Sequence, residues 1–283
     1  MRETMIEFTK MHGIGNDYIY INCLKKSLKN LSKLAVAMSD RHFGIGSDGL
    51  ILILPSKKAD FKMRMFNSDG SEAEMCGNGI RCFAKYVYDH KLTKKSQLQI
   101  ETLAGIMELT LYIKKNKVES VLIDMGAPIL ERAQIPMLGE PGTVIQETLR
   151  LLDGSKFEIT SLSMGNPHVV IFVEDVDNFP VTKYGPQIEN SDLFPHKTNV
   201  EFIEIINEKE FKQRTWERGS GETLGCGTGA SAATVACILN EKTKGKVTAH
   251  LTGGDLEIEW KENNEHVFLK GPAVEVFSGT WPN

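Results

Sequence analysis

Two stretches of this sequence, 150 residues apart, share one arrangement: a cysteine, a Gly-x-Gly segment and then a run that favours a helix. Cys76 opens the first as C-G-N-G, and Cys226 opens the second as C-G-T-G. An asparagine that precedes an apolar run recurs at the same interval, as Asn16 and Asn166. The chain is therefore predicted to hold two copies of one folding unit, each of which gives a cysteine and an asparagine to a shared site.

Each of the two cysteines is expected at the start of a helix. Apolar residues at positions 80, 83, 84 and 87 follow Cys76 with helical spacing, and the run 231–239 is small and apolar nearly all round, which is typical of a buried helix. A thiol at a helix N-terminus is acidified by the helix dipole, from a free pKa of about 8.5 towards about 3.5–7.5. The N–H groups there can also hold a carboxylate or a phosphate. The pattern predicts reactive thiols beside an anion site.

Length and charge limit the class of protein. The 283 residues favour two domains, at about 150 residues per domain. A net charge of −4, with lysine pairs scattered along the chain, indicates no nucleic-acid partner. The first residues are too charged for a signal peptide and no apolar run reaches membrane length, so we expect a cytoplasmic protein with no membrane partner. The five cysteines form no C-x-x-C pair, so we expect neither a disulfide framework nor a metal site.

The apolar pattern predicts strands over most of the chain and one central helix in each copy. We expect an α+β fold of two pseudo-symmetric domains, each a curled, mostly antiparallel β-sheet around its central helix. The predicted domains are residues 1–125, which carry Cys76, and residues 126–271, which carry Cys226. The last segment, 272–283, is expected to return and complete the first domain.

One familiar motif is rejected on its context. Residues 44–49 form a literal G-x-G-x-x-G, which in dinucleotide-binding proteins follows a strand and opens a helix. Here the segment follows a predicted helix and opens the predicted strand 50–54, so it is not interpreted as a dinucleotide site. Later in the chain, three strands are expected between the second central helix and Phe277.

The residues around both cysteines resemble the diaminopimelate epimerase family. The stretch from Asn67 to Arg81, N-S-D-G-S-E-A-E-M-C-G-N-G-I-R, meets that family's signature in full, and E-R-G through C-G-T-G, residues 217–229, meets its second cysteine block. Further matches are F-T-K-M-H-G-I-G-N-D at 8–17 and M-G-N-P-H at 164–168, and the resemblance runs from about residue 6 to 277. The chain departs from some members, which carry glutamine where it has Gly49.

The resemblance implies an isomerase that converts LL-2,6-diaminopimelate to meso-diaminopimelate, in lysine and peptidoglycan synthesis, without a cofactor. Inverting a carbon needs a base and an acid on opposite faces, and two near-equivalent cysteines can supply them. The sequence alone cannot tell which cysteine is the acid and which is the base. The resemblance to the family implies that Cys226 is the base toward the LL isomer and that Cys76 is the acid. A homodimer is a further expectation.

The resemblance also implies roles for polar residues of both copies. His168 and Glu217 are expected to tune the thiols. The expected substrate-binding residues are Asn16, Asn67, Gly77, Asn78, Asn166, Asn199, Glu217, Arg218, Gly227 and Thr228. The guanidinium of Arg218 suits the distal carboxylate because its fork can bind both oxygens.

Other interpretations of these residues remain open. Asn16 and Asn166 could be turn residues, since asparagine tolerates a left-handed backbone, and Arg81 could brace its loop through a carboxylate such as Glu74. Cys23, Cys82 and Cys237 are expected to be small core hydrophobes. The same fold could act instead on proline or hydroxyproline, although these have no second amino-acid end for Arg218 and Glu217 to hold. A non-enzymatic thiol or metal protein is the third alternative.

Overall fold

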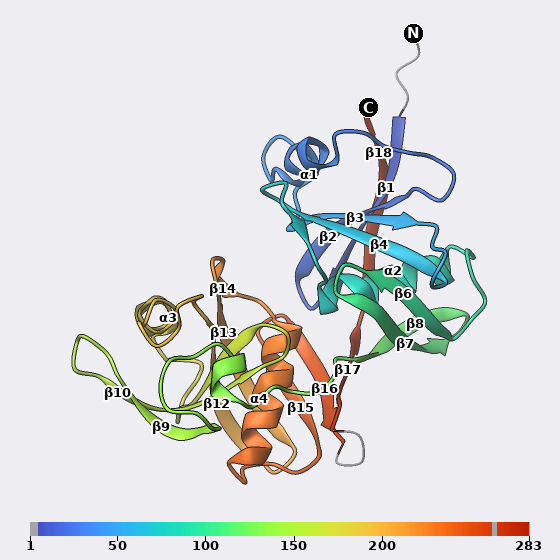
Figure 1. Cartoon of the computed structure of the whole chain (residues 1–283). Helices are drawn as coiled ribbons and strands as arrows, with labels where there is room; N and C mark the ends of the chain where they lie inside the picture. The colour runs from blue at the N-terminus through green and yellow to red at the C-terminus, as the bar shows by residue number, and fades with distance from the viewer. Residues whose placement is uncertain (1–4, 262–264, 283) are drawn as a thin grey trace. The chain divides into compact units, whose positions relative to one another are not determined.

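The computed structural model describes residues 5–261 and 265–282. Contacts divide the chain into two compact units, of which the first comprises Met1–Ile123 with Gly271–Asn283 and the second Asp124–Lys270. Each unit is a strand-rich α+β structure, which confirms the predicted fold class (Figure 1). No helix of the described residues is long and apolar enough to cross a membrane.

The first unit is a curled, mixed sheet that encloses helix α2 (Gly77–Asp89). Antiparallel pairs alternate with two parallel ones, β2 with β3 and β4 with β6. Helix α2 contacts β1, β2, β3, β7 and β18, so strands from separate parts of the sheet surround it (Figure 1). The strands are β1 (Met5–Gly13), β2 (Asn16–Asn22), β3 (Gly49–Leu54), β4 (Phe61–Asn67), β5 (Glu72–Ala73), β6 (Gln97–Thr102), β7 (Gly105–Lys114), β8 (Lys117–Asp124) and β18 (Val274–Pro282).

The second unit repeats this topology around helix α4 (Gly227–Leu239). Its parallel pairs are β11 with β12 and β13 with β15, and α4 contacts β10, β11, β12, β15 and β16 (Figure 1). The strands are β9 (Val144–Arg150), β10 (Lys156–Ser163), β11 (Pro167–Phe172), β12 (Asn199–Asn207), β13 (Glu210–Glu217), β14 (Gly221–Thr223), β15 (Lys246–Leu251), β16 (Gly254–Trp260) and β17 (Val267–Pro272); a 3-10 turn, η1, spans Arg132–Gln134.

The helices show the repeat most directly. Helices α2 and α4 begin and end 150 residues apart, and so do α1 (Leu31–Ser39) and α3 (Val181–Glu189). The hairpins β1–β2 and β10–β11 are equivalent, but their outer neighbours come from different parts of the sequence. Strand β1 pairs with the C-terminal β18, whereas β10 pairs with the preceding β9. Both sheets thus gain an equivalent antiparallel neighbour from different places in the sequence.

Each sheet is covered on both faces by apolar groups. Helix α4 is buried nearly all round, and two of its hydroxyl groups are satisfied by its own carbonyls: Ser231 Oγ donates to Gly227 O at 3.0 Å and Thr234 Oγ1 to Ala230 O at 2.9 Å. On the other face, Ala35 and Met38 of α1 belong to one core cluster, and Val181 and Ile188 of α3 to the other. The central helices are therefore fixed by packing on all sides.

Two expectations about single elements had different outcomes. Residues 44–49 do lead from α1 into β3, which confirms that this glycine segment is not placed as a dinucleotide fingerprint. The expectation of three strands after the second central helix is wrong, because four follow it, β15 to β18. The predicted last strand is interrupted at Ala273, beside Pro272, which has no backbone N–H to donate to a ladder.

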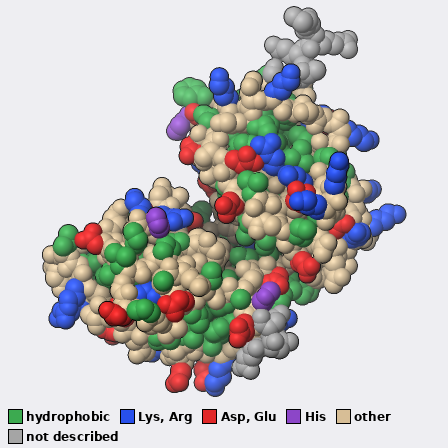
Figure 2. Space-filling model, viewed as in Figure 1, with side chains coloured by type: hydrophobic (Ala, Val, Ile, Leu, Met, Phe, Trp, Pro, Cys, Tyr) green, Lys and Arg blue, Asp and Glu red, His purple; other side chains and the backbone are tan. Residues whose placement is uncertain are grey.

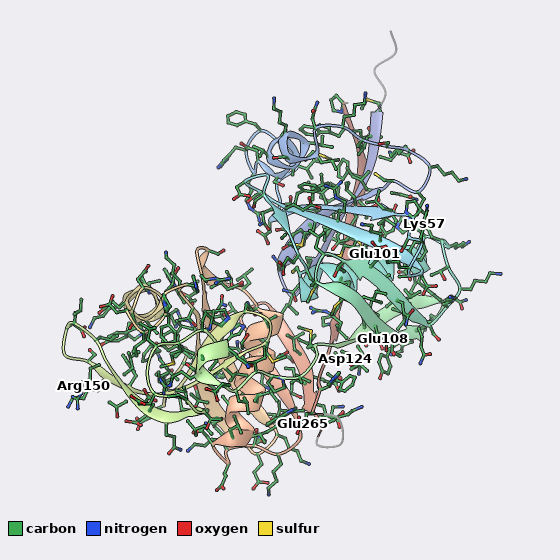
Figure 3. The ribbon with its side chains drawn as sticks, in the orientation of Figure 1. Lys57, Glu101, Glu108, Asp124, Arg150 and Glu265 are labelled. Atoms are coloured by element: carbon green, nitrogen blue, oxygen red, sulfur yellow. The ribbon has the colours of Figure 1, made fainter. Side chains whose placement is uncertain are left out.

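Charged side chains cover the outside of both units. On the visible face, acidic and basic groups are interspersed on each unit, with no large patch of one sign (Figure 2). Glu108 on β7 and Arg150 on β9 are examples of exposed charges that point outward from their own unit (Figure 3). The polar side chains near the two cysteines differ from these, since many of them are buried.

The packing around α4 predicts a large loss of stability when it is disturbed. Leu256 on β16 is fully buried, so Leu256→Ala should lower the free energy of unfolding by about 2–5 kcal/mol. The control is Leu152→Ala in the same unit, where the side chain is fully exposed and the change should stay within about 0.5 kcal/mol. Urea denaturation of the full chain measures both, and equal shifts would contradict this description of the core.

Candidate active site

Cys76 caps helix α2 with its sulfur. Its backbone is extended, with φ −137° and ψ 124°, and Sγ accepts the N–H of Gly79 at 3.4 Å. Sulfur here replaces the side-chain oxygen that usually accepts the N–H of the third helical residue. The helix predicted after Cys76 is confirmed, and the first turn of a helix leaves N–H groups without intrahelical partners.

Asn16 lies beside this thiol and is oriented by a carboxylate. Its amide nitrogen donates to Asp48 Oδ2 at 2.6 Å, which turns its carbonyl oxygen Oδ1 toward Cys76. Cys76 Sγ donates to that oxygen at 3.3 Å, and Asn78 Nδ2 does so at the same distance. Asn16, Cys76 and Asn78 therefore form one hydrogen-bonded group in the first unit.

Arg81 is fully buried behind the same turn. Its guanidinium donates to Asn78 Oδ1 at 2.7 Å and to the carbonyls of Gly77 and Pro272, each at 3.2 Å. Burial lowers the pKa of this guanidinium. The expectation that Arg81 is braced by Glu74 is wrong, because the helix points the side chain inward to these oxygens and not to the outer loop.

Cys226 occupies the equivalent cap of helix α4. Its sulfur accepts the N–H of Gly229 at 3.3 Å and lies 3.4 Å from Thr228 Oγ1. Its side chain is buried, whereas Cys76 is partly exposed. The two thiols thus have the same backbone setting and different access to solvent.

A buried polar network lies behind Cys226. His168 Nδ1 is 2.9 Å from Glu201 Oε1, and His168 Nε2 is 3.0 Å from Asn166 Oδ1. Asn166 Nδ2 in turn donates to Thr228 Oγ1 at 3.3 Å. His168 and Glu201 are both fully buried, and a Cβ at Gly229 would fall 2.4 Å from Glu201 Oε1, so the first turn of α4 rests on this network.

Glu217 is the second carboxyl group near Cys226. Burial raises the pKa of Glu217, while hydrogen bonds with Thr223 and Cys226 act against that shift. Burial also raises the pKa of the Cys226 thiol well above its usual range, and the charges of Glu217 and Glu201 add to the effect. Hydrogen bonds from Thr228 and from the Gly229 N–H lower it again. The acidification expected at a helix N-terminus is therefore outweighed at Cys226 by burial and by neighbouring carboxylates.

The remaining predicted binding residues lie at or just beyond the ends of strands, Asn67 in the first unit and Asn199 and Arg218 in the second. Asn67 ends β4, where it pairs with Gly49 and donates from Nδ2 to Ser71 Oγ at 3.0 Å. Asn199 begins β12 and is held by two bonds, donating to Pro167 O at 2.8 Å and accepting the N–H of Arg218 at 3.0 Å. The side chain of Arg218 is exposed, and among the described residues its guanidinium donates to His196 O at 3.1 Å, so most of its N–H groups can still bind an anion.

The structure brings these residues together within each unit. Asp48, Tyr18 and Glu201 also belong to the two groups, although the sequence did not single them out. The 150-residue interval could have found Tyr18, since it is the counterpart of His168. The predicted sets are, in the first unit, Cys76, Gly77, Asn78, Asn16 and Asn67, and in the second, Cys226, Gly227, Thr228, Asn166, His168, Asn199, Glu217 and Arg218.

A possible metal-binding group lies elsewhere on the second unit. Carboxylate oxygens of Asp175, Asp177 and Glu204 come within 4.8 Å of one another, and no other such group occurs among the described residues. Lys212 Nζ already contacts Asp177 at 2.6 Å, and Glu204 accepts the N–H of Val176 at 3.0 Å. This group belongs to the outer surface and includes neither cysteine.

Comparison with known proteins decides the family. The sequence pattern described as diaminopimelate epimerase matches residues 8–131 and 160–276. A protein named diaminopimelate epimerase from Agathobacter rectalis is 55% identical over 280 residues, covering 97% of this chain and 98% of its own. The chain belongs to the diaminopimelate epimerase family.

Solved structures of lower identity share the fold. A phenazine biosynthesis protein from Bacillus anthracis superposes with a TM-score of 0.72 at 18% identity, covering 99% of this chain and 100% of its own. A hydroxyproline epimerase from Agrobacterium vitis does so with a TM-score of 0.70 at 12% identity, covering 98% and 92%. At these identities the likeness concerns the architecture of the two units alone.

Gly49, where some family members carry glutamine, has no space for a side chain. A Cβ there would lie 2.2 Å from the carbonyl oxygen of Phe66 and 3.1 Å from Cε1 of Tyr18. Burial raises the pKa of the Tyr18 hydroxyl well above its usual range, and a hydrogen bond with Cys76 adds to the shift. The ring of Tyr18 thus packs over the glycine while its hydroxyl reaches the thiol.

The burial of the five thiols predicts the order in which they react. Burial raises the pKa of Cys82 to about 11 and raises that of Cys23 and Cys237 as well. Only a thiolate is alkylated, so iodoacetamide at pH 8 should label Cys76 first in the native protein. Mass spectrometry of peptides measures the order, and all five should react in guanidinium. Native labelling of Cys82 as fast as Cys76 would contradict this arrangement.

Proposed function

We propose that this chain is a diaminopimelate epimerase that interconverts LL- and meso-diaminopimelate, with Cys76 and Cys226 as its acid and base and with no cofactor. One observation carries the proposal: two equivalent cysteines each cap a buried helix, and an asparagine of the same repeat is linked to each, Asn16 directly and Asn166 through Thr228. Family membership supplies the substrate, because the relatives at 55% identity bear that enzyme's name. The product would serve lysine and peptidoglycan synthesis in the cytoplasm.

The reaction needs two groups on opposite faces of one α-carbon. The thiolate of Cys226 takes the proton of the LL isomer, so that a C–H bond breaks and an S–H bond forms. The thiol of Cys76 then gives its own proton to the other face, which forms the new C–H bond and leaves a thiolate. The next reaction in the opposite direction reverses both transfers, so each sulfur must be stable in both protonation states.

The helix N-termini would hold the carboxylate at the reacting carbon. N–H groups of Gly77, Asn78, Gly227 and Thr228 lie in the first turns of α2 and α4. Such groups and the helix dipoles stabilise an anion, and they gain in strength as negative charge develops on the substrate when the proton leaves. The cysteines cap these same first turns, so in each unit the N–H groups that would hold the carboxylate lie beside the sulfur that would transfer the proton.

Glu217 would hold the proton that Cys226 gives up before catalysis. The pKa values of both groups are raised by burial and the two are hydrogen-bonded, so they act as a coupled pair that shares one proton and one charge. Moving the proton from sulfur to carboxylate changes no net charge in the buried site. A thiolate can therefore form at Cys226 despite its burial.

The distal end of the substrate would be held by the residues at the strand ends. The exposed fork of Arg218 can take a carboxylate through two parallel bonds, and Asn67, Asn166 and Asn199 offer amides for the amino and carboxylate groups. Proline has no second amino-acid end for these residues to hold. This favours diaminopimelate over proline or hydroxyproline, the alternative substrates of the same architecture.

Removing either thiol should abolish most of the turnover. Cys76→Ser or Cys226→Ser places an alcohol where the acid–base group was, and each should lower kcat for LL-diaminopimelate by at least 10²–10⁴-fold, the usual contribution of one positioned acid or base. The measurement is conversion by dialysed, folded protein, with proline assayed beside it.

The matched control is Cys82→Ser, six residues along α2 from Cys76 and fully buried in the core. It should cost packing energy and leave kcat near that of the wild type. Wild-type protein that converts proline and not diaminopimelate would overturn the substrate, and a folded Cys82→Ser as inactive as Cys76→Ser would overturn the two-cysteine assignment.

The assembly we propose is a homodimer formed through β18. Among the pairings that the structure describes, β18 has one, with β1, and exposes Val274, Val276 and Phe277. A long edge strand with apolar side chains is a template for pairing with another chain, and a second copy offers an identical edge.

If β18 forms the dimer interface, a positive charge placed on this strand should disrupt the dimer. Val276→Lys should convert the dimer to a monomer, since a lysine on the edge opposes strand pairing. The control is Leu103→Lys, which places the same charge at an exposed apolar residue of the same unit. Light scattering after size-exclusion chromatography measures the mass. A Val276→Lys variant that remains dimeric would contradict the proposed interface.

A further inference from the structure

The two equivalent asparagines are held in opposite orientations. Asn16 presents its carbonyl oxygen to the sulfur of Cys76 at 3.3 Å. Asn166 presents its amide nitrogen to Thr228 Oγ1 at 3.3 Å, and that oxygen lies 3.4 Å from the sulfur of Cys226. Residues that the repeat makes equivalent thus offer an acceptor on one side and the start of a donor chain on the other.

A carboxylate fixes the orientation of Asn16. Asp48 can only accept hydrogen bonds when ionised, so it selects the amide nitrogen of Asn16, at 2.6 Å. Arg41 lies 2.8 Å from the other oxygen of Asp48 and keeps a positive charge beside it. The carbonyl of Asn16 is left facing the thiol.

Glu201 is a fully buried carboxyl group with several hydrogen-bond donors around it. Gln213 Nε2 and Thr215 Oγ1 donate to its Oε2 at 2.8 and 2.6 Å, and His168 Nδ1 lies 2.9 Å from its Oε1. Three donors on two oxygens favour the charged form. A fully buried carboxylate needs a counter-charge, and of the side chains that the structure describes only that of His168 lies within ion-pair distance.

Both ring nitrogens of His168 face an oxygen atom, and an N–H on each nitrogen would satisfy both contacts. Nδ1 lies 2.9 Å from Glu201 Oε1, and Nε2 lies 3.0 Å from Asn166 Oδ1, an amide oxygen that can only accept a hydrogen bond. This turns the amide nitrogen of Asn166 to Thr228 Oγ1, and the Thr228 hydroxyl is left to donate to Cys226. The hydrogen-bond donors of His168, Asn166 and Thr228 thus all point along the chain toward the sulfur of Cys226.

We propose that Asp48 and Glu201 are positioning residues that hold the equivalent asparagines in opposite orientations, so that Cys76 faces an acceptor and Cys226 a donor. An acceptor stabilises a thiol and a donor stabilises a thiolate, so the device makes Cys76 the acid and Cys226 the base. These acid–base roles rest on the proposed function, whereas the orientations are properties of the folded chain. The repeat is symmetric at the asparagines and is broken by the residues behind them.

Other groups near the sulfurs act in the opposite sense. Arg81 and the Tyr18 hydroxyl favour a thiolate at Cys76, and Glu217 favours a thiol at Cys226. Opposed effects keep the two protonation states of each sulfur close in free energy, as a reversible reaction requires. The hydrogen-bond polarity adds a contribution of opposite sign at the two sulfurs, toward a thiol at Cys76 and toward a thiolate at Cys226.

The decisive test is the protonation of His168 in the full chain, read from its ring nitrogens. In protein labelled with ¹⁵N-histidine at pH 8, both ring nitrogens of His168 should carry protons, with the signals assigned by their loss in His168→Gln. Glu201→Gln should remove one of these protons. The control Thr215→Val takes one donor from Glu201 and keeps its charge, so both protons should remain.

A bare ring nitrogen on wild-type His168 would overturn the proposal, and so would a Glu201→Gln protein that keeps both protons. If that variant does not fold, the wild-type spectrum alone still supports or overturns the proposal. These spectra do not depend on activity, so they separate failure of this inference from failure of the proposed function.

Kinetics test the first unit. Asp48→Asn can donate as well as accept, so Asn16 is free to turn its amide toward Cys76. We expect kcat for LL-diaminopimelate to fall by about 10–100-fold, as when the outer partner of a metal-bound histidine is removed. The control Arg41→Gln removes the ion pair with Asp48 and leaves Asn16 oriented, so kcat should stay near that of the wild type. Wild-type turnover in Asp48→Asn would overturn the role of Asp48.

Discussion

A bond from a backbone N–H to a cysteine sulfur sets the geometry of both halves of this protein. Gly79 and Gly229 each donate to the cysteine that caps their helix, at 3.4 and 3.3 Å. The bond fixes each sulfur at the first turn of a helix that is packed on all sides by a curled sheet. Because neither helix can shift without breaking its core, each thiol is held rigidly within its own unit.

The two halves share this device and differ in the charges behind it. The thiol of Cys226 lies in front of two fully buried and hydrogen-bonded side chains, His168 and Glu201, and beside Glu217. The thiol of Cys76 lies beside a buried guanidinium, that of Arg81, with no buried carboxylate bonded to that group among the described residues. Duplication gives two equivalent positions, and substitution of the residues around them gives two thiols in different electrostatic settings.

The sequence allowed prediction of features encoded by short local patterns. The C-G-x-G segments place helix starts at Cys76 and Cys226, and the 150-residue interval predicts the repeat. Glu201 could not be predicted, since a charged residue in an alternating strand usually faces solvent; its burial depends on the register of β12, which places it opposite Thr215 and two residues beyond the partner of His168. The raised pKa of Cys226 likewise depends on tertiary burial that outweighs the helix dipole.

The origin of the new α-hydrogen tests the two-cysteine account most directly. Purified protein is incubated with LL-diaminopimelate in deuterated water, and product and remaining substrate are analysed during the first turnovers. If one cysteine removes the proton and the other delivers its own, each molecule of meso product should carry one deuterium at the inverted carbon while unreacted LL substrate stays unlabelled. Product that retains the original α-hydrogen would show that a single group carries it across, and would contradict the account.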